Sequence, residues 1–301
     1  PVWRLKYTNK RERHPMRILI TGGKGMLART LVAELGKNPD YTLLAPGHTE
    51  LDITDPMSVT KVFGEFEPEV VLHCAAFTKV DLCESEQARA QEVNVQGSAN
   101  IAMACKQSNA RLIAFSTDYV FDGESGPYNE FAKPTGGINV YGQSKWAAER
   151  TIRLDCPNHV IARVSWLYGP GGPSFVHTML RLAGRPCIRV VDDQRGCPTS
   201  TLAVAGAIAE ILQKPHLLGT FHLACQGETT WYGLAREIFA LAGIEQNVEP
   251  CTSAEYVTPA KRPSNSCLVS VRMKDCGLSP MPHWQESLKS FLARELPTLG
   301  L

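Results

Sequence analysis

Two residues with complementary acid–base chemistry stand four positions apart in the segment VYGQSKWAAER, residues 140–150. Because residues i and i+4 share one face of a helix, the phenol of Tyr141 and the ammonium of Lys145 are predicted to point into one cleft. A free phenol has a pKa near ~10, and a neighbouring cation favours the phenolate and lowers that pKa. The pair is therefore predicted to act as a tuned acid that protonates a carbonyl oxygen while a hydride reaches the carbonyl carbon.

Hydroxyl side chains precede this pair in the segment AFSTDYVF, at the end of an expected strand. Ser116 and Thr117 stand at the carboxyl end of that strand, where open α/β sheets bind their ligands. A tyrosine and a lysine with this spacing also occur on ordinary protein surfaces. A hydroxyl, a tyrosine and a lysine in this order, after a nucleotide loop, form a specific combination, so Thr117, Tyr141 and Lys145 are the candidate catalytic residues.

The expected nucleotide loop is the segment TGGKGMLA, residues 21–28, between the first strand and the first helix. Gly22, Gly25 and Ala28 fit the pattern G-x-x-G-x-x-A. Small residues let the backbone approach a pyrophosphate, and the N-terminus of the helix offers free N–H groups with a partial positive charge. A glycine turn is common by itself, but this one stands at the first turn of a strand–helix alternation, which favours a dinucleotide site.

The choice between NADPH and NADH is left open by the residues after the second strand. Neither an acid nor an arginine follows YTLLAP directly, where an acid ordinarily binds the adenosine 2′-hydroxyl. His48 there and Lys24 in the loop slightly favour a 2′-phosphate. Asp52 and Ile53 are predicted to flank the adenine, and the alternative is that Asp52 and Asp55 only cap the next helix.

Alternating strand and helix patterns indicate how these residues are positioned. They predict the α/β fold class, with a doubly wound parallel (Rossmann) sheet covered by helices on both faces. Residues 16–170 are predicted to form the NAD(P)-binding Rossmann domain. Residues 171–301 are predicted to form mainly a smaller C-terminal substrate-binding lobe, with one sheet strand and helices that return to the Rossmann domain. The expected strands are 16–23, 41–46, 69–76, 111–117, 158–166 and 187–193, and one long helix is expected over 85–109.

Composition narrows the classes of function. The chain has 301 residues, 44% of them hydrophobic, which allows a sizeable core, and its net charge of +1 favours neither nucleic acid nor a membrane surface as a partner. Apolar runs stay below the ~20 residues of a membrane span, and a secretory signal is not evident. The ten cysteines form no C-x-x-C and the eight histidines no H-x-x-x-H. We therefore expect the cysteines to be buried free thiols and the protein to lie in the cytoplasm. We expect no metal site.

The first fifteen residues, PVWRLKYTNKRERHP, are polar and basic and show no periodicity. We expect residues 1–15 to be an N-terminal extension, disordered or introduced by cloning. The alternative is a short basic arm that binds an anionic partner. Loss of activity after deletion of these residues would favour the arm.

Taken together, these motifs resemble those of the extended short-chain dehydrogenases/reductases, and more narrowly those of the dTDP-4-dehydrorhamnose reductases. That family reduces the 4-keto group of a dTDP-6-deoxy-L-hexose to give dTDP-L-rhamnose. The resemblance runs from about Met16 to the last helix. It is carried by GGKGMLA, LDITD, HCAAFTKVD, STDYVFDG, YNE, NVYGQSK, RVSWLYG, FVHTML, VVDDQRGCPT and RPSNS.

The resemblance implies a role for each matching residue. Tyr141 is the general acid, Lys145 holds the nicotinamide ribose, and Thr117 hydrogen-bonds the substrate carbonyl. The cofactor is NADPH, with NADH as an alternative, and its binding residues are Gly22, Gly25, Met26, Leu27, Asp52, Ile53, Ala75, Ala76, Phe77, Thr78, Tyr141 and Lys145. The substrate-binding residues are Thr117, Asp118, Trp166, Arg262 and Asn265. The alternatives are a core aromatic for Trp166 and a solvated surface arginine for Arg262.

Departures from the family pattern concern the substrate lobe above all. His177 stands where the family often has a lysine, and Cys267 where it often has an arginine; Ala28 and Ala148 replace glycines.

The resemblance as a whole implies NAD(P)H-dependent reduction of dTDP-4-dehydro-L-rhamnose for surface polysaccharide synthesis, in a monomer or a homodimer. The alternatives are a reductase of another nucleotide-linked 4-keto-6-deoxy sugar and a non-catalytic regulatory relative. A metal-dependent hydrolase is disfavoured by the histidine spacing.

Overall fold

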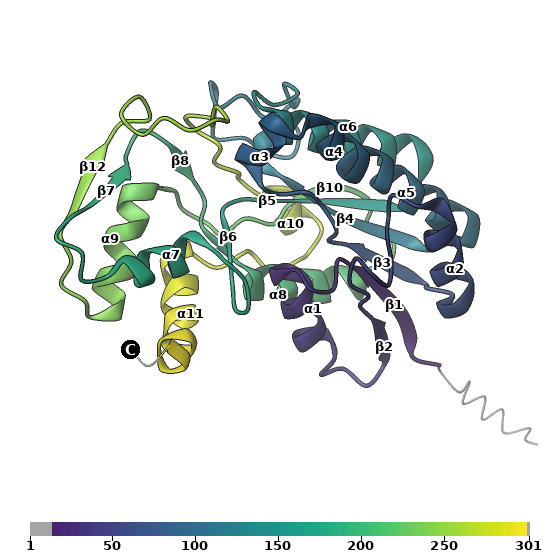
Figure 1. Ribbon diagram of the computed structural model, residues 1–301. Helices are drawn as coiled ribbons and strands as arrows, with labels where there is room; N and C mark the ends of the chain where they lie inside the picture. Colours follow the sequence, from purple (N-terminus) through teal and green to yellow (C-terminus); the bar gives the residue numbers. More distant parts are fainter. Residues whose placement is uncertain (1–13, 300–301) are drawn as a thin grey trace, which may run out of the picture.

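The computed structural model describes residues 14–299, so the expected extension lies outside the described residues except for its last two positions. Its centre is a sheet of six strands, drawn on the right of Figure 1, in the order β10-β5-β4-β3-β1-β2. Every neighbouring pair is parallel. The strands are β1 (Met16–Thr21), β2 (Tyr41–Leu44), β3 (Val70–His73), β4 (Arg111–Thr117), β5 (His159–Val164) and β10 (Gly219–His222).

The order of the strands places the ligand site. β1 lies between β2 and β3, so the chain changes direction across the sheet after β2. Ligands of such sheets bind outside the carboxyl ends of the strands at this switch point. β3 and β4 are buried along their whole length, as expected for strands covered on both faces.

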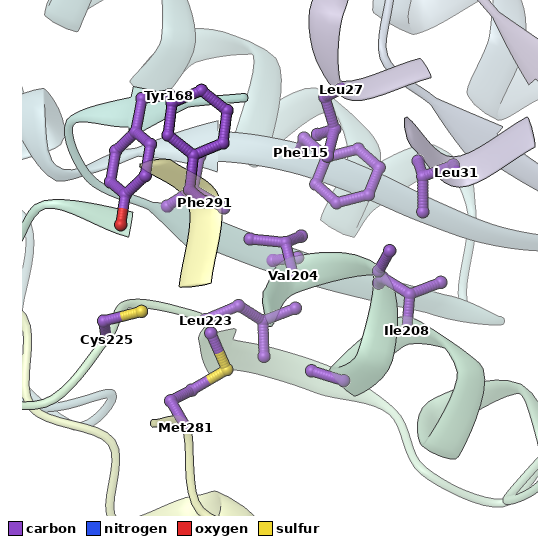
Figure 2. Close-up of a cluster of buried hydrophobic side chains, with 14 of the residues drawn as sticks. Leu27, Leu31, Phe115, Tyr168, Val204, Ile208, Leu223, Cys225, Met281 and Phe291 are labelled. Atoms are coloured by element: carbon purple, nitrogen blue, oxygen red, sulfur yellow. The ribbon is translucent and has the colours of Figure 1, made fainter. Parts of the chain in front are cut away.

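Helices cover both faces of the sheet and make two separate cores. On one face, α2 (Pro56–Phe66), α5 (Gly97–Ser108) and α6 (Val140–Asp155) enclose one apolar cluster with the strands. On the other face, α1 (Met26–Leu35) and α8 (Thr201–Leu212) pack together over a larger cluster. Figure 2 shows part of that cluster, where Leu27 and Leu31 of α1 lie near Val204 and Ile208 of α8.

The larger cluster continues into a second lobe, which is drawn on the left of Figure 1. Three small sheets pair β7 (Ile188–Val191) with β12 (Val248–Cys251), β8 (Arg195–Gly196) with β11 (Thr229–Thr230), and β6 (Leu167–Tyr168) with β9 (Thr199–Ser200). The helices of this part are α7 (Phe175–Leu182), α9 (Trp231–Ala242) and α11 (Trp284–Leu299), whereas α10 (Arg272–Asp275) packs against β10 of the central sheet. Phe291 of α11 and Tyr168 of β6 reach the shared core seen in Figure 2.

Two expected elements differ from the structure. The strand expected over 187–193 is β7, which pairs with β12 in the second lobe and is not part of the central sheet. Ile188, Val190 and Val191 are buried, and only Arg189 of this strand is exposed to solvent. The sixth central strand is instead β10, only four residues long.

The long helix expected over 85–109 is divided. α3 (Val80–Ser85) precedes it, and α4 (Gln87–Ala90) passes through a π-helical segment, η1 (Gln91–Gln96), into α5. A π-helical turn accommodates a local shift of register and often occurs at functional sites. Asn94, in this turn, is buried and directed at the ligand side of the sheet, as described below.

Candidate active site

A cleft of about 860 Å³ opens at the carboxyl ends of the central strands. The predicted site residues that line it are Gly22, Gly25, Met26, Leu27, Asp52, Ile53, Ala75, Ala76, Phe77, Thr78, Thr117, Asp118, Tyr141, Lys145 and Trp166. Two predicted residues, Arg262 and Asn265, are not among its lining residues. The structure therefore gathers the three candidate catalytic residues and all the predicted cofactor residues around one space.

The glycine loop is held close to the backbone on both sides. Gly22 has a φ of 67°, and a Cβ added there would lie 2.9 Å from Cα of Ala75. A Cβ added at Gly23 would overlap the carbonyl oxygen of Ala45. α1 starts after Gly25 without a side-chain cap, so its first N–H groups face the cleft without a side-chain partner. The loop thus has the shape and the donors of a pyrophosphate site.

The expected adenosine end combines a cation with a hydrogen-bonded acid. The Lys24 side chain crosses Gly47, where an added Cβ would lie 2.8 Å from Cε of the lysine, and both Lys24 and the neighbouring His48 line the cleft. The side-chain and backbone hydrogen bonds from Thr54 lower the pKa of Asp52. Asp55 caps α2 by accepting the N–H of Met57 at 2.9 Å, whereas Asp52 lines the cleft and does not cap that helix.

Tyr141 and Lys145 lie on α6, whose start is set by Asn139. The Asn139 side chain accepts the N–H of Gly142 at 2.8 Å and so caps the helix immediately before the tyrosine. The Lys145 Nζ is buried and donates to the carbonyl oxygen of Phe115 in β4 at 2.8 Å. Burial lowers the pKa of Lys145 to about 8, and the carboxylate of Glu149 opposes that shift.

The predicted lowering of the tyrosine pKa is wrong for this structure. Burial raises the pKa of Tyr141, and the hydroxyl of Thr117 opposes the rise only in part. The physical reason is that desolvation of the buried phenol outweighs the hydrogen bond with Thr117. The phenol is accordingly held in its protonated form, which is the form that a general acid needs.

Asp118 has a buried carboxyl group that three hydroxyl groups contact. Thr117 donates to its Oδ1 at 2.9 Å, and Ser165 and Ser266 donate to its Oδ2 at 3.0 and 2.6 Å. Burial raises the pKa of Asp118 to about 6 despite these bonds. Because Ser266 comes from the second lobe, the carboxyl group joins that lobe to the ends of β4 and β5.

The remaining predicted substrate-binding residues are Trp166, which lines the cleft, and Arg262 and Asn265, which do not. Trp166 is partly buried, lines the cleft and stacks on Trp231 of α9, with ring centroids 3.5 Å apart. Arg262 donates to the carboxylate of Asp81 at 2.9 Å, to the Ala260 carbonyl at 3.0 Å and to the Thr258 hydroxyl.

Asn265 forms hydrogen bonds with its own segment and with Gly123. Its Oδ1 accepts the N–H of Cys267 at 3.1 Å, and its backbone N–H donates to the Gly123 carbonyl at 3.2 Å. The expected sugar-nucleotide contacts of Arg262 and Asn265 therefore remain predictions, because the hydrogen bonds of both side chains lie within the protein.

Sequence reasoning singled out Ser116 but missed Asn94 and Glu149, two buried polar residues that support the site. Asn94 accepts the N–H of Phe77 at 2.7 Å and donates to its carbonyl at 3.1 Å and to Ser144 of α6 at 2.9 Å. Ser116 lines the cleft but donates its hydroxyl to Glu149 at 2.6 Å. The available signal was Glu149 itself, which continues the i, i+4 series of Tyr141 and Lys145 along α6.

Residues 14–299 contain neither a metal-binding cluster nor a membrane-spanning helix. Within that range, three or more histidine, cysteine, aspartate or glutamate side chains nowhere gather closely enough to hold a metal ion. The helices of that range also include none with the length and apolar character needed to cross a membrane.

Known proteins resemble this chain over nearly its whole length. The family model described as the RmlD substrate binding domain matches residues 16–296. A dTDP-4-dehydrorhamnose reductase of Streptomyces griseus is 44% identical over 283 residues, which cover 90% of this chain and 91% of that protein. A dTDP-4-keto-6-deoxy-D-glucose reductase of Streptomyces niveus is 38% identical and covers 90% of this chain and 95% of its own length.

A solved structure gives the same result in three dimensions. The dTDP-4-dehydrorhamnose reductase of Bacillus anthracis, in complex with NADP, superposes with a TM-score of 0.90 at 37% identity. The superposition covers 93% of this chain and 99% of that one. The chain described here therefore belongs to the dTDP-4-dehydrorhamnose reductase family, which the RmlD substrate binding domain model represents.

Proposed function

We propose that the protein reduces the C4 ketone of dTDP-4-dehydro-L-rhamnose to dTDP-L-rhamnose with NADPH. The observation that carries the proposal is that Thr117, Tyr141 and Lys145 line one cleft with the glycine loop of Gly22 and Gly25. A chain that only bound the nucleotide would have no need of this acid beside it. Family membership supplies the substrate class, since relatives with 44% and 39% identity are named dTDP-4-dehydrorhamnose reductases.

The residues present fit a nicotinamide dinucleotide phosphate. Gly22 packs too closely against Ala75 for a Cβ, so the loop presents backbone to the cleft, and the uncapped start of α1 offers N–H groups beside it. Lys24 and His48 would hold the 2′-phosphate, and Ala75, Ala76 and Phe77 would lie along the rest of the cofactor. When bound, NADPH supplies the hydride.

The side chains of the chain itself supply the proton and the orientation. The Tyr141 phenol donates its proton to the oxygen at C4, and burial keeps that phenol protonated until it is needed. The Thr117 hydroxyl, which donates to Asp118 in the structure, would turn its proton to the same oxygen and hold it beside the phenol. Lys145 is bound to the β4 backbone, where its positive charge stabilises the phenolate that remains.

The test combines turnover with the identity of the product. Purified protein is mixed with NADPH and dTDP-4-dehydro-L-rhamnose, and nicotinamide absorbance is followed. The proposal predicts oxidation of NADPH and a product whose proton couplings around C4 are those of dTDP-L-rhamnose. NADPH binding without oxidation would contradict the proposed reaction and favour a regulatory relative.

A sibling reaction is the second candidate function. It is favoured by the relative named dTDP-4-keto-6-deoxy-D-glucose reductase and by two residues of the substrate lobe. His177 contacts Glu295 of α11 at 2.9 Å, and Cys267 is buried, so neither position has the lysine or arginine that the family often has there. Oxidation of NADPH with a product of the other C4 configuration would select this candidate.

The proposal also covers the cellular compartment and the oligomeric state of the protein. The ten cysteines, all of them among the described residues, are free thiols, which suits a reducing compartment such as the cytoplasm. A monomer and a homodimer both remain predictions, and light scattering of the purified protein distinguishes them.

A further inference from the structure

Trp166 has an unusual backbone conformation where the cleft meets the second lobe. It follows β5 and Ser165, and its φ is 45°, in the left-handed region that bulky side chains rarely adopt. Such a conformation costs free energy and persists only where the surrounding structure holds it. The neighbours of Trp166 should therefore show what maintains it.

The indole of Trp166 is held from the side of the second lobe. It stacks on Trp231 with ring centroids 3.5 Å apart and an interplanar angle of 4°, and Phe175 packs on Trp231 in turn at 4.7 Å. A Cβ added at Gly196 would overlap the edge of the Trp166 indole, so the glycine makes room for it. Trp166 also lines the cleft, together with Thr117 and Tyr141.

Trp231 is itself oriented by polar contacts. Its Nε1 donates to Oε1 of Gln194 at 3.1 Å, and Nε2 of Gln194 donates to Ser253 at 2.8 Å. Trp231 is also the first residue of α9, whose N-cap Thr230 accepts the N–H of Gly233 at 3.0 Å. These contacts fix the orientation of the Trp231 ring on which the Trp166 indole stacks.

We propose that Trp231 is a positioning residue for the sugar end of the cleft: it holds Trp166 in its strained conformation, so that the Trp166 indole forms a wall for the apolar side of a 6-deoxyhexose. This inference rests on the proposed function. A 6-deoxyhexose carries a methyl group where other hexoses carry a hydroxymethyl group, and an indole packs well against such C–H groups. Trp231 touches neither the ketone nor the cofactor, so its effect should fall on sugar binding.

The experiment compares three variants with the wild type. Trp231→Leu removes the stack, Trp231→Phe keeps an aromatic ring, and Tyr232→Ala is the matched control on the same helix, where the ring lies 5.7 Å from the guanidinium of Arg236. Circular dichroism of the free proteins reports the stack directly, because two parallel indoles at van der Waals distance couple their transitions. Steady-state kinetics give kcat and KM for dTDP-4-dehydro-L-rhamnose, and fluorescence titration gives Kd for NADPH.

The inference predicts a split between binding and chemistry. Trp231→Leu should lose the coupled indole signal and raise KM for the sugar nucleotide about tenfold, with kcat within about twofold and Kd for NADPH unchanged. Trp231→Phe and Tyr232→Ala should stay within about threefold of the wild-type KM. An unchanged KM in Trp231→Leu, or an equal loss of kcat and NADPH affinity, would overturn the inference.

Two additions keep the test decisive. If Trp231→Leu does not fold, Gln194→Met removes the acceptor of the Trp231 N–H and should raise KM about threefold; an unchanged KM would then overturn the inference. Failure of the proposed function would appear in the wild type, as absence of NADPH oxidation. In that case calorimetric titration with dTDP-L-rhamnose compares the same variants without turnover, and equal affinities would overturn the inference as well.

Discussion

Backbone forms the nucleotide end of the cleft, whereas side chains from distant segments form the sugar end. At the nucleotide end, the loop of Gly22 and Gly23 and the uncapped start of α1 present backbone, and close packing against Ala45 and Ala75 forbids side chains. At the sugar end, side chains from distant segments meet: Ser165 and Ser266 contact Asp118, and Trp231 stacks on Trp166. One end therefore depends on a short local motif, and the other on how the second lobe is seated.

Substitutions at the two ends of the cleft should therefore affect different ligands. A change in the glycine loop should abolish cofactor binding whatever the sugar, because the loop has no spare room. A change in the second lobe should alter sugar affinity while leaving the cofactor site intact. Related enzymes that act on different sugars would then share the first end and vary the second.

The largest expected effect comes from adding one methyl group to the loop. Gly23→Ala would place a Cβ into the carbonyl oxygen of Ala45, so the loop must move away from the segment after β2. We expect Kd for NADPH to rise by about a hundredfold and stability to fall by about 1–3 kcal/mol. Fluorescence titration and urea unfolding measure the two effects.

The matched control is Gly64→Ala in α2. An added Cβ there meets nothing within 4 Å, so the variant should bind NADPH normally and gain roughly 0.5–1 kcal/mol of stability. Wild-type affinity in Gly23→Ala would show that the close packing of the loop does not matter, and would remove the contrast between the two ends.

The next effect concerns the buried acid at the sugar end. Burial raises the pKa of Asp118 from 3.8 to about 6, so the folded state holds the proton more tightly than the unfolded chain does. This stabilises the folded state below about pH 4 and is lost as the pH rises through about 6. The difference corresponds to about 3 kcal/mol.

Asp118→Asn does not titrate, so the wild type should lose up to about 3 kcal/mol relative to this variant between about pH 4 and pH 7. Urea unfolding at several pH values measures the free energy of unfolding of both proteins. Parallel pH profiles would mean that the carboxyl group is less desolvated than the structure indicates.

A smaller effect is expected from Lys145, which lies between the two ends. Because burial lowers the pKa of Lys145 to about 8, the cation should be lost above that pH and kcat/KM should fall by up to about tenfold per pH unit. Lys145→Arg should lower the activity but remove this alkaline limb, since a guanidinium stays charged. A wild-type profile that is flat up to about pH 9.5 would contradict this role.

The two ends also differ in how far sequence alone predicts them. β1, the glycine loop and α1 follow from a buried apolar run, a glycine pattern and helical spacing within twenty or so neighbouring positions, and the structure has them there. The i, i+4 spacing likewise placed Tyr141 and Lys145 on one helix facing one cleft. Local periodicity is sufficient where the function depends on local backbone.

Elements decided by tertiary contacts were not predicted. The strand GTFH of β10 is too short and too polar to stand out, whereas β7 has a stronger strand pattern but joins the second lobe. The pKa of Tyr141 rises because the phenol is buried, which its spacing from Lys145 does not reveal. The pairing of Trp166 with Trp231 and of Asp118 with Ser266 joins segments separated by whole elements, so no local pattern indicates it.

The central claim is that Tyr141 supplies the proton beside a cofactor that the loop binds independently. The most direct test measures Tyr141→Phe and wild type together, with single-turnover oxidation of NADPH by dTDP-4-dehydro-L-rhamnose and a separate titration of NADPH. The structure predicts a fall in the rate of about a hundredfold or more with Kd for NADPH unchanged. A variant that oxidises NADPH at the wild-type rate would contradict the account.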